Sequence, residues 1–183
     1  MIPRPARRRL QIAIIAPLGV LVCAAAASAA SVFPPRRAGF WETTMTMAMT
    51  LKGKPVDSDK APWVSAMCAD PATDAIALDK MVGNGGNCLK FDITKSGDTY
   101  TIAGSCPDPM GGGKGVMTTH GTMIYHGDTA IHIASDSVSP SMTSHIDGDA
   151  KWIGACPAGM KPGDFGTMPG GVFKKQGNML EGK

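Results

Sequence analysis

Charged residues are scarce in this chain of 183 residues, since Asp, Glu, Lys and Arg make up only 18% of it. So low a charge content disfavours long solvent-exposed helices and excludes a heptad-rich coiled coil. The length excludes a large multidomain enzyme and suits one domain. Gly and Pro are abundant instead, with 23 and 14 residues, which favours turns and short strands. The hydrophobic content of 43% is enough for a core, so the composition is not that of a disordered chain.

Signatures of several common activities are missing. The Gly-rich stretch at residues 111–115 fails as a Walker A phosphate loop, because Asp108 stands where that loop needs Gly and Gly115 where it needs Ser or Thr. The chain also lacks a dinucleotide fingerprint and a pair of carboxylates in a recognisable enzyme context. The histidines do not have metalloenzyme spacing, and we expect each to be exposed to solvent: His120, His126, His132 and His145. The sequence therefore names no catalytic residue, metal or cofactor, and a protein that is not an enzyme is expected.

Residues 1–29 have the pattern of a secretory signal peptide. Arginines precede an apolar run from Leu10 to Ala27, and the small residues at 27–29 suit signal peptidase. We predict cleavage after Ala29, export to the periplasm and no stable membrane span afterwards. An uncleaved anchor is the alternative, since the run nearly reaches the length that spans a bilayer. Without residues 1–29 the balance is 14 basic against 15 acidic residues, so the basic footprint of a nucleic-acid-binding protein is lost.

An even number of cysteines remains after the predicted cut: Cys68, Cys88, Cys106 and Cys156. Disulfides are favoured in an oxidising compartment, and a metal site of four thiolates is disfavoured because no Cys-x-x-Cys pair is present. Four cysteines allow three pairings. Pairing of neighbours in the sequence, Cys68 with Cys88 and Cys106 with Cys156, is preferred because each bond then closes a local loop. The pairing itself is left open.

The pattern of the mature chain predicts one antiparallel β domain over residues 39–156, after an extended lead-in at residues 30–38. Apolar and polar residues alternate from Trp41 to Leu51, which indicates a half-buried strand. Asp70-Pro71 starts one short helix, which the glycines at 83–86 end. The fold is expected to be mainly β: a single curled sheet or partly open barrel, stapled by disulfides. Residues 157–183 are rich in Gly and Pro, and a largely flexible tail is expected there. Further strands are predicted at residues 63–68, 88–94, 99–105, 116–125, 129–135 and 142–152.

The first alternating strand carries the clearest candidate site, formed by Met45, Met47 and Met49 on its apolar side. In one interpretation they belong to the core or line a pocket for an apolar ligand, because Met adapts to irregular apolar surfaces. In another they bind Cu(I), a soft ion that suits thioethers, with help from His120 or another Met. Sulfurs along one strand lie roughly 7 Å apart, so a copper site needs a ligand from another strand.

The order of short motifs along the chain resembles that of one known family. The motifs are Gly-Phe-Trp-Glu-Thr-Thr at residues 39–44, Lys-Trp-Ile-Gly-Ala-Cys at residues 151–156 and the segment that follows to Asp164, with the four cysteines in order. Residues 39–164 thus resemble the bacterial periplasmic family called domain of unknown function 3617. The resemblance implies export and an antiparallel β domain, and it brings no catalytic residue or cofactor.

The expected function is a non-enzymatic binding or interaction module, whose partner is a small apolar ligand or a protein. A periplasmic Cu(I)-binding protein and an enzyme of unknown type are the alternatives.

Overall fold

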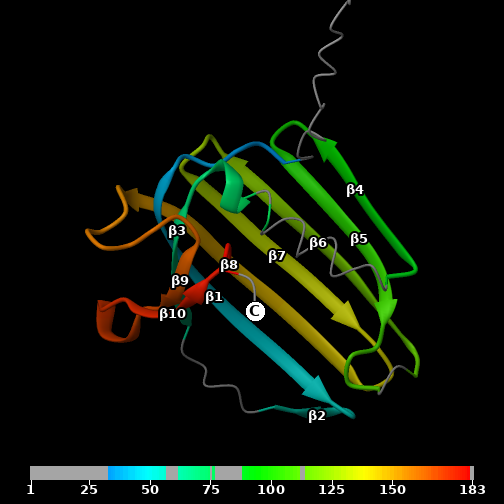
Figure 1. The fold of residues 1–183 in the computed structure, drawn as a ribbon. Coiled ribbons are helices and arrows are strands. Elements are labelled where there is room, and N and C mark those ends of the chain that lie inside the picture. The colour runs from blue at the N-terminus through cyan, green and yellow to red at the C-terminus, as the bar shows by residue number, and fades with distance from the viewer. Residues whose placement is uncertain (1–32, 57–61, 75, 77–87, 112–113, 182–183) are drawn as a thin grey trace, which may run out of the picture. The chain divides into compact units, whose positions relative to one another are not determined.

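Ten strands form one antiparallel sheet in the computed structural model, which describes residues 33–56, 62–74, 76, 88–111 and 114–181 (Figure 1). The strands follow the order β10-β9-β3-β1-β8-β7-β6-β5-β4, with β2 paired to β1, and the described strands do not close into a barrel. The prediction of a mainly β fold built on a single antiparallel sheet is confirmed, and the structure adds that this sheet is open. The strands are β1 (Gly39–Leu51), β2 (Lys54–Pro55), β3 (Trp63–Ala69), β4 (Lys90–Ser96), β5 (Thr99–Pro107), β6 (Val116–His126), β7 (Ala130–Val138), β8 (Met142–Gly154), β9 (Asp164–Thr167) and β10 (Lys174–Asn178).

Turn residues set the boundaries of the central strands. Gly97 and Gly127 have φ of 59° and 64°, the left-handed conformation that glycine adopts without strain, and they connect β4 to β5 and β6 to β7. These turns separate the strands predicted at residues 88–94 and 99–105 and at residues 116–125 and 129–135, and the bounds of the predicted strands differ from the observed ones by up to three residues. The described helices are one at residues 71–74 and 76 and the short 3-10 helix η2 (Pro169–Gly171). No helix among the described residues is long and apolar enough to cross a membrane.

The register divides the sheet into two faces, because residues opposite each other on paired strands point to the same side. Trp41 lies opposite Met67 of β3, with Trp152 of β8 as its partner on the other side. We call the face that carries these three side chains the inner face and the other the outer face. The core lies on the inner face, where Trp41 is 1% exposed. Its buried members are Phe33, Trp41, Ala69, Tyr100, Met123, Tyr125, Ile131 and Ala150.

Residues 33–38, which we call the lead-in segment, contribute to this core. The ring of Phe33 is buried, with its centroid 5.1 Å from that of Tyr100. The guanidinium of Arg36 lies 5.0 Å from the ring centroid of Trp41, and its Nε donates a hydrogen bond to Asp74 at 2.9 Å. Trp41 Nε1 in turn donates to the carbonyl oxygen of Arg37 at 2.8 Å. The lead-in segment is therefore fixed to the inner face by ring contacts, an ion pair and an indole hydrogen bond.

The start of the predicted helix is confirmed by its cap. The Asp70 carboxylate accepts a hydrogen bond from the Thr73 backbone N–H at 2.8 Å, and the Asp70 N–H donates to the Thr73 hydroxyl at 2.7 Å. Pro71 occupies the first helical position, where its missing N–H costs nothing. This turn carries Asp74 to Arg36. The predicted remainder of the helix, residues 77–83, lies outside the described residues, as does the predicted signal peptide, residues 1–29.

The disulfides join Cys68 to Cys156 and Cys88 to Cys106, so the preferred pairing of sequence neighbours is wrong. Spatial order explains the difference. Phe40 of β1 lies opposite Cys68 on one side and Gly154 on the other, which brings the residues just after β8 beside β3. Cys88 precedes β4, whose antiparallel partner β5 contains Cys106. The order of strands in the sheet decides the pairing.

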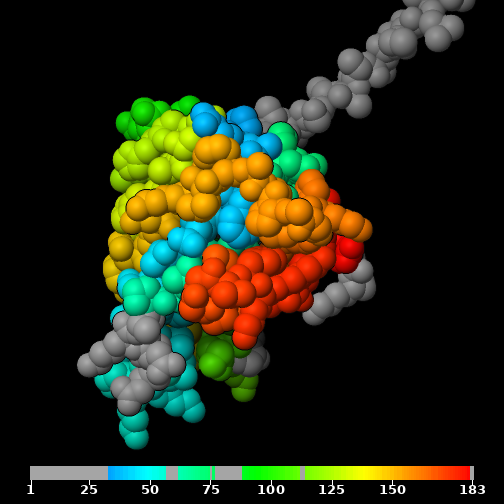
Figure 2. Space-filling model, turned by 90° about the vertical axis from the view of Figure 1, so that its left-hand side faces the viewer, coloured from blue at the N-terminus to red at the C-terminus, as the bar shows by residue number. Residues whose placement is uncertain are grey.

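Residues 164–178 form β9 and β10, so the expectation of a largely flexible tail does not hold for them. β9 pairs with β3, and Phe173 packs edge-on against Phe40 with ring centroids 5.8 Å apart. Figure 2 shows these residues, in orange and red, beside the blue and cyan N-terminal part of the sheet. Asp164 is buried in this hairpin, where hydrogen bonds from the Lys161 N–H and the Lys175 ammonium lower its pKa to about 2.

The two disulfides should differ in their contribution to stability, because they close loops of different length. The paired residues are 88 and 18 positions apart, for which loop closure predicts about 4.5 and about 3 kcal/mol. Replacing Cys68 and Cys156 together by Ser should therefore destabilise the protein more than replacing Cys88 and Cys106, as measured by equilibrium unfolding in urea. Peptide mapping without reductant provides the check, and a Cys68–Cys88 peptide would contradict this connectivity.

Candidate functional site

The inner face extends beyond the core along β1 and β8. Past Thr43, the inner positions of these two strands and of the start of β3 are large and apolar except for Ser144 and Gly148. We call this surface the methionine face; its members are Met45, Met47, Met49, Leu51, Trp63, Met142 and Ile146. The three candidate methionines of the sequence therefore lie together on it, on the side predicted.

The methionine face is much more accessible than the core on the same side of the sheet. Met47 is 50% exposed and Trp63 52%, whereas Met123 of the core is 6% exposed. The other members are partly buried. Met45 extends over β8, where a Cβ on Gly148 would lie 2.6 Å from the Cγ of Met45. The same Cβ would lie 2.5 Å from the backbone oxygen of Thr44, so glycine at position 148 allows β1 and β8 to approach closely.

Charged side chains are missing from the inner side of the sheet over most of its width. The inner positions of β1, β8, β7, β6 and β5 carry none, by the register of these described strands. The inner polar groups near the methionine face are hydroxyls, and those of Thr119 and Ser137 hydrogen-bond each other at 2.8 Å. A surface of this composition can bind hydrocarbon.

All four histidines lie on the outer face instead. His120, Asp136 and His145 follow one another across β6, β7 and β8 at paired positions, and His145 Nδ1 lies 2.7 Å from Asp136 Oδ1. His132 pairs in the same way with Asp149. His120 is therefore on the opposite side of the sheet from Met45, Met47 and Met49 and cannot share an ion with them. Among the described residues, no group of three or more His, Cys, Asp or Glu side chains is arranged to hold a metal.

A shallow groove of about 490 Å³ lies across β7, β8, β1 and β2. By the alternation of the strands, most of the residues that line it belong to the outer face, and Met47, Met49, Ser137 and Ser144 are the inner-face positions among them. The groove was not predicted, because it requires strands that are distant in the sequence to be neighbours. Its outer-face residues are Ala48, Thr50, Pro55, Asp136, Val138, Thr143 and His145.

Asp108 holds together two loops at the end of the sheet where the methionine face lies. Its carboxylate is 1% exposed and accepts hydrogen bonds from the Ser141 hydroxyl at 2.6 Å and from two backbone N–H groups of its own loop. These bonds, that from Ser141 first, lower the pKa of Asp108 below its ordinary value. The Ser141 carbonyl accepts from the Lys52 N–H at 2.8 Å, and the Asp108 N–H donates to Gly115 at 3.1 Å. Asp108 thus connects the turn after β1 to the loop before β6.

A family model described as "Protein of unknown function (DUF3617)" matches residues 36–156, about two thirds of the chain. The chain belongs to this family. The resemblance stated from the sequence is therefore confirmed, while export to the periplasm remains a prediction. The matched region of this DUF3617 chain begins at Arg36, which packs on Trp41, and ends at Cys156, which is bonded to Cys68. A comparison with curated proteins found no match.

Replacing Asp108 by Asn should destabilise this DUF3617 protein at neutral pH. A carboxyl group whose pKa is lowered by folding stabilises the native state above its unfolded pKa of about 4, and this contribution is lost as the pH falls through the lower folded value. The melting temperature of Asp108→Asn should therefore be below that of wild type at pH 7, and the difference should shrink at pH 3. Asp98→Asn, at an exposed turn, is the control. An equal difference at both pH values would contradict the argument.

Proposed function

We propose that this protein is a non-enzymatic binding module that holds a small, elongated apolar ligand on its methionine face. The observation that carries the proposal is the contrast along the inner face. One end is closed by the lead-in segment around Trp41, and the other leaves Met47 and Trp63 about half exposed. A contiguous apolar surface of this kind on a folded protein usually marks a binding site.

The side chains of this surface suit a ligand of variable shape. Met is unbranched and its sulfur is polarisable, so a row of Met can adapt to different hydrocarbons. Each methylene group that is buried contributes about 0.8 kcal/mol, so ten of them contribute about 8 kcal/mol. Association costs a similar amount in lost freedom of motion. Apolar contact alone therefore supports weak and exchangeable binding, as a carrier or sensor requires.

Met47→Glu provides a direct test of this site. Because Met47 is half exposed, the variant should fold, and its carboxylate should weaken binding of the apolar fluorophore N-phenyl-1-naphthylamine by roughly tenfold or more. Fluorescence titration measures the affinity, and the melting temperature reports folding.

Thr46→Glu is the matched control, since it adds the same charge one residue away on the outer face. Equal loss of affinity in both variants, or none in either, would contradict binding at the methionine face.

One observation keeps Cu(I) binding as a second candidate function. Met142 lies opposite Leu51, diagonal to Met49 on the same face, and so supplies the second-strand thioether that a row of Met along β1 needs. In this alternative, Met49 and Met142 bind the ion, and Met47 and Met45 lie further along the same row.

Competition with bicinchoninate measures this binding. The triple variant in which Met45, Met47 and Met49 become Leu should bind Cu(I) at least about tenfold more weakly, whereas Met110→Leu, at an exposed loop position, should behave as wild type. Unchanged binding by the triple variant would exclude this function.

A further inference from the structure

We infer that the ligand of the methionine face is a free, single-chain anionic amphiphile such as a fatty acid, whose carboxylate binds Lys52, Lys54 and Lys114 at the open end of that face. The inference rests on the proposed function and specifies the class of ligand. Lys114 belongs to the Gly-rich stretch that fails as a Walker A loop, and no motif in the sequence groups it with Lys52 and Lys54.

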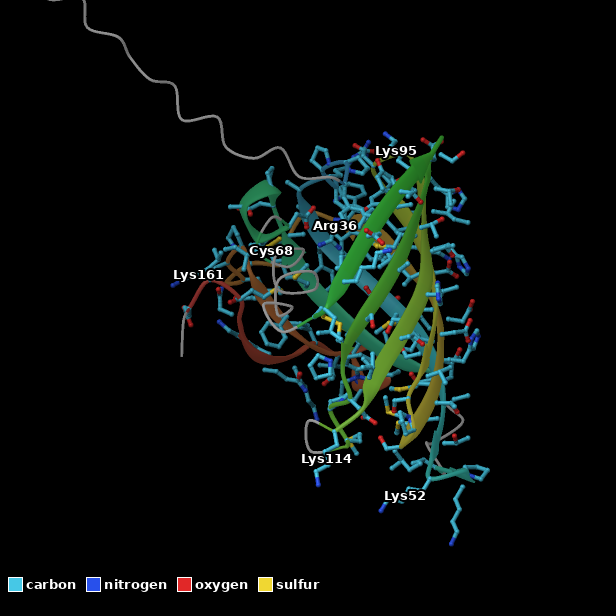
Figure 3. The ribbon with its side chains drawn as sticks, turned by 90° about the vertical axis from the view of Figure 1, so that its right-hand side faces the viewer. Arg36, Lys52, Cys68, Lys95, Lys114 and Lys161 are labelled. Carbon is cyan, nitrogen blue, oxygen red and sulfur yellow. A yellow bond between two sulfur atoms is a disulfide. The ribbon has the colours of Figure 1, made fainter. Side chains whose placement is uncertain are left out.

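The three lysines lie at one end of the sheet, next to apolar inner-face residues. Lys52 follows Leu51 directly, Lys54 belongs to the hairpin partner of β1, and Lys114 comes three residues before Met117, an inner-face residue of β6. Figure 3 shows Lys52 and Lys114 at the same end of the sheet, away from Arg36 and Lys95 at the other end. All three lysines are exposed. The apolar face therefore ends at a group of positive charges.

Hydrogen bonds fix the positions of the two loops that carry these charges. The Lys52 N–H is bound to the Ser141 carbonyl, the Ser141 hydroxyl to the Asp108 carboxylate, and the Asp108 N–H to the Gly115 carbonyl. Lys52 and Lys114 are thus connected through a continuous chain of short contacts. Asp108 is buried, and its carboxylate oxygens accept hydrogen bonds from the Ser141 hydroxyl and from backbone amides. Its negative charge is therefore stabilised by these donors and not by the three lysines.

The charge of this end is not neutralised by acidic side chains of the described residues. Some basic groups elsewhere on the molecule form ion pairs, as Arg36 does with Asp74, Arg37 with Asp128, Lys90 with Asp92 and Lys175 with Asp164. Within the described ranges, Lys52, Lys54 and Lys114 form no such pair. An anionic group at the end of an apolar ligand complements this arrangement, and partial desolvation beside Leu51 and Met142 strengthens the attraction.

The length of the surface fits one extended chain. From Met45 to Leu51 the strand rises about 3.4 Å per residue, so the row measures roughly 20 Å. A long acyl chain laid along β1 would cover the row and place its carboxylate beside Lys52. The row lies on the side of the sheet that also holds the core and the lead-in segment. A monomeric amphiphile can reach such a face more readily than a bilayer surface can.

The test compares three ligands with the same twelve-carbon chain, namely dodecanoate, dodecanol and dodecyltrimethylammonium, below their micellar concentrations. Displacement of N-phenyl-1-naphthylamine from the full-length protein measures their affinities. Dodecanoate should bind about tenfold more tightly than dodecanol, and the cation most weakly. The preference for dodecanoate should fall as salt is added.

Replacing Lys52, Lys54 and Lys114 by Gln should abolish the preference for dodecanoate and leave the affinity for dodecanol unchanged. Lys161→Gln removes an exposed charge elsewhere on the molecule and should keep the preference (Figure 3). Because all these lysines are exposed, the variants should melt as wild type does.

Each other outcome has a distinct meaning. Equal affinity for dodecanoate and dodecanol in wild type would overturn the inference but not the proposed function, whereas failure of the fluorophore itself to bind would overturn the proposed function. Sedimentation with phosphatidylglycerol vesicles, combined with no displacement by dodecanoate, would show that the anion comes from a membrane surface and would overturn the assignment to a free ligand.

Discussion

The burial of Trp41 is the interaction on which the rest of the structure depends. Its ring contacts the guanidinium of Arg36, and its indole N–H is bound to the Arg37 carbonyl. Its neighbours in the sheet, Met67 and Trp152, come from strands that are far apart in the chain. Arg36 connects Trp41 to the helix that follows β3, because its guanidinium also forms an ion pair with Asp74 of that helix. A charge pair of this kind is tolerated in a largely buried position because both partners are hydrogen-bonded. One tryptophan thus connects the lead-in segment, three strands and a helix.

This arrangement stabilises only one end of a long sheet. β1 has 13 residues. Its first part, with Trp41, belongs to the core, whereas the part from Met45 to Leu51 extends beyond the core. A protein optimised for stability alone would cover such a surface or make it polar, because exposed apolar area contributes nothing to folding and favours aggregation. The contrast between the closed and the open end is therefore a feature that function explains better than stability.

Sequence reasoning predicted the local features and failed where the arrangement depends on distant strands. Alternation of apolar and polar residues located seven of the ten strands, because this signal is contained within a few residues, whereas β2, β9 and β10 were not predicted. The disulfides could not be inferred, since Cys68 and Cys156 meet only because β1 lies between β3 and β8. The C-terminal glycines predict flexibility, yet at Gly166 a Cβ would lie 2.0 Å from the Lys174 carbonyl oxygen. Glycine is required there by close packing. Met45, Met47 and Met49 were found from alternation, whereas the lysine group depends on the contact between Asp108 and Ser141 and has no sequence signal.

The position of β1 in the middle of the sheet has a consequence for how the protein folds. β1 pairs with β8, so that Phe40 lies opposite Gly154 and Leu51 opposite Met142, about a hundred residues later in the chain. During synthesis the first strand emerges long before its partner, and it cannot complete its pairing until almost the whole domain is available. Contacts of such high sequence separation make folding slow. Throughout that interval the edge of β1 that β8 later occupies is unpaired, although β3 can already pair with the other edge, so this protein needs protection from aggregation most while it is being made.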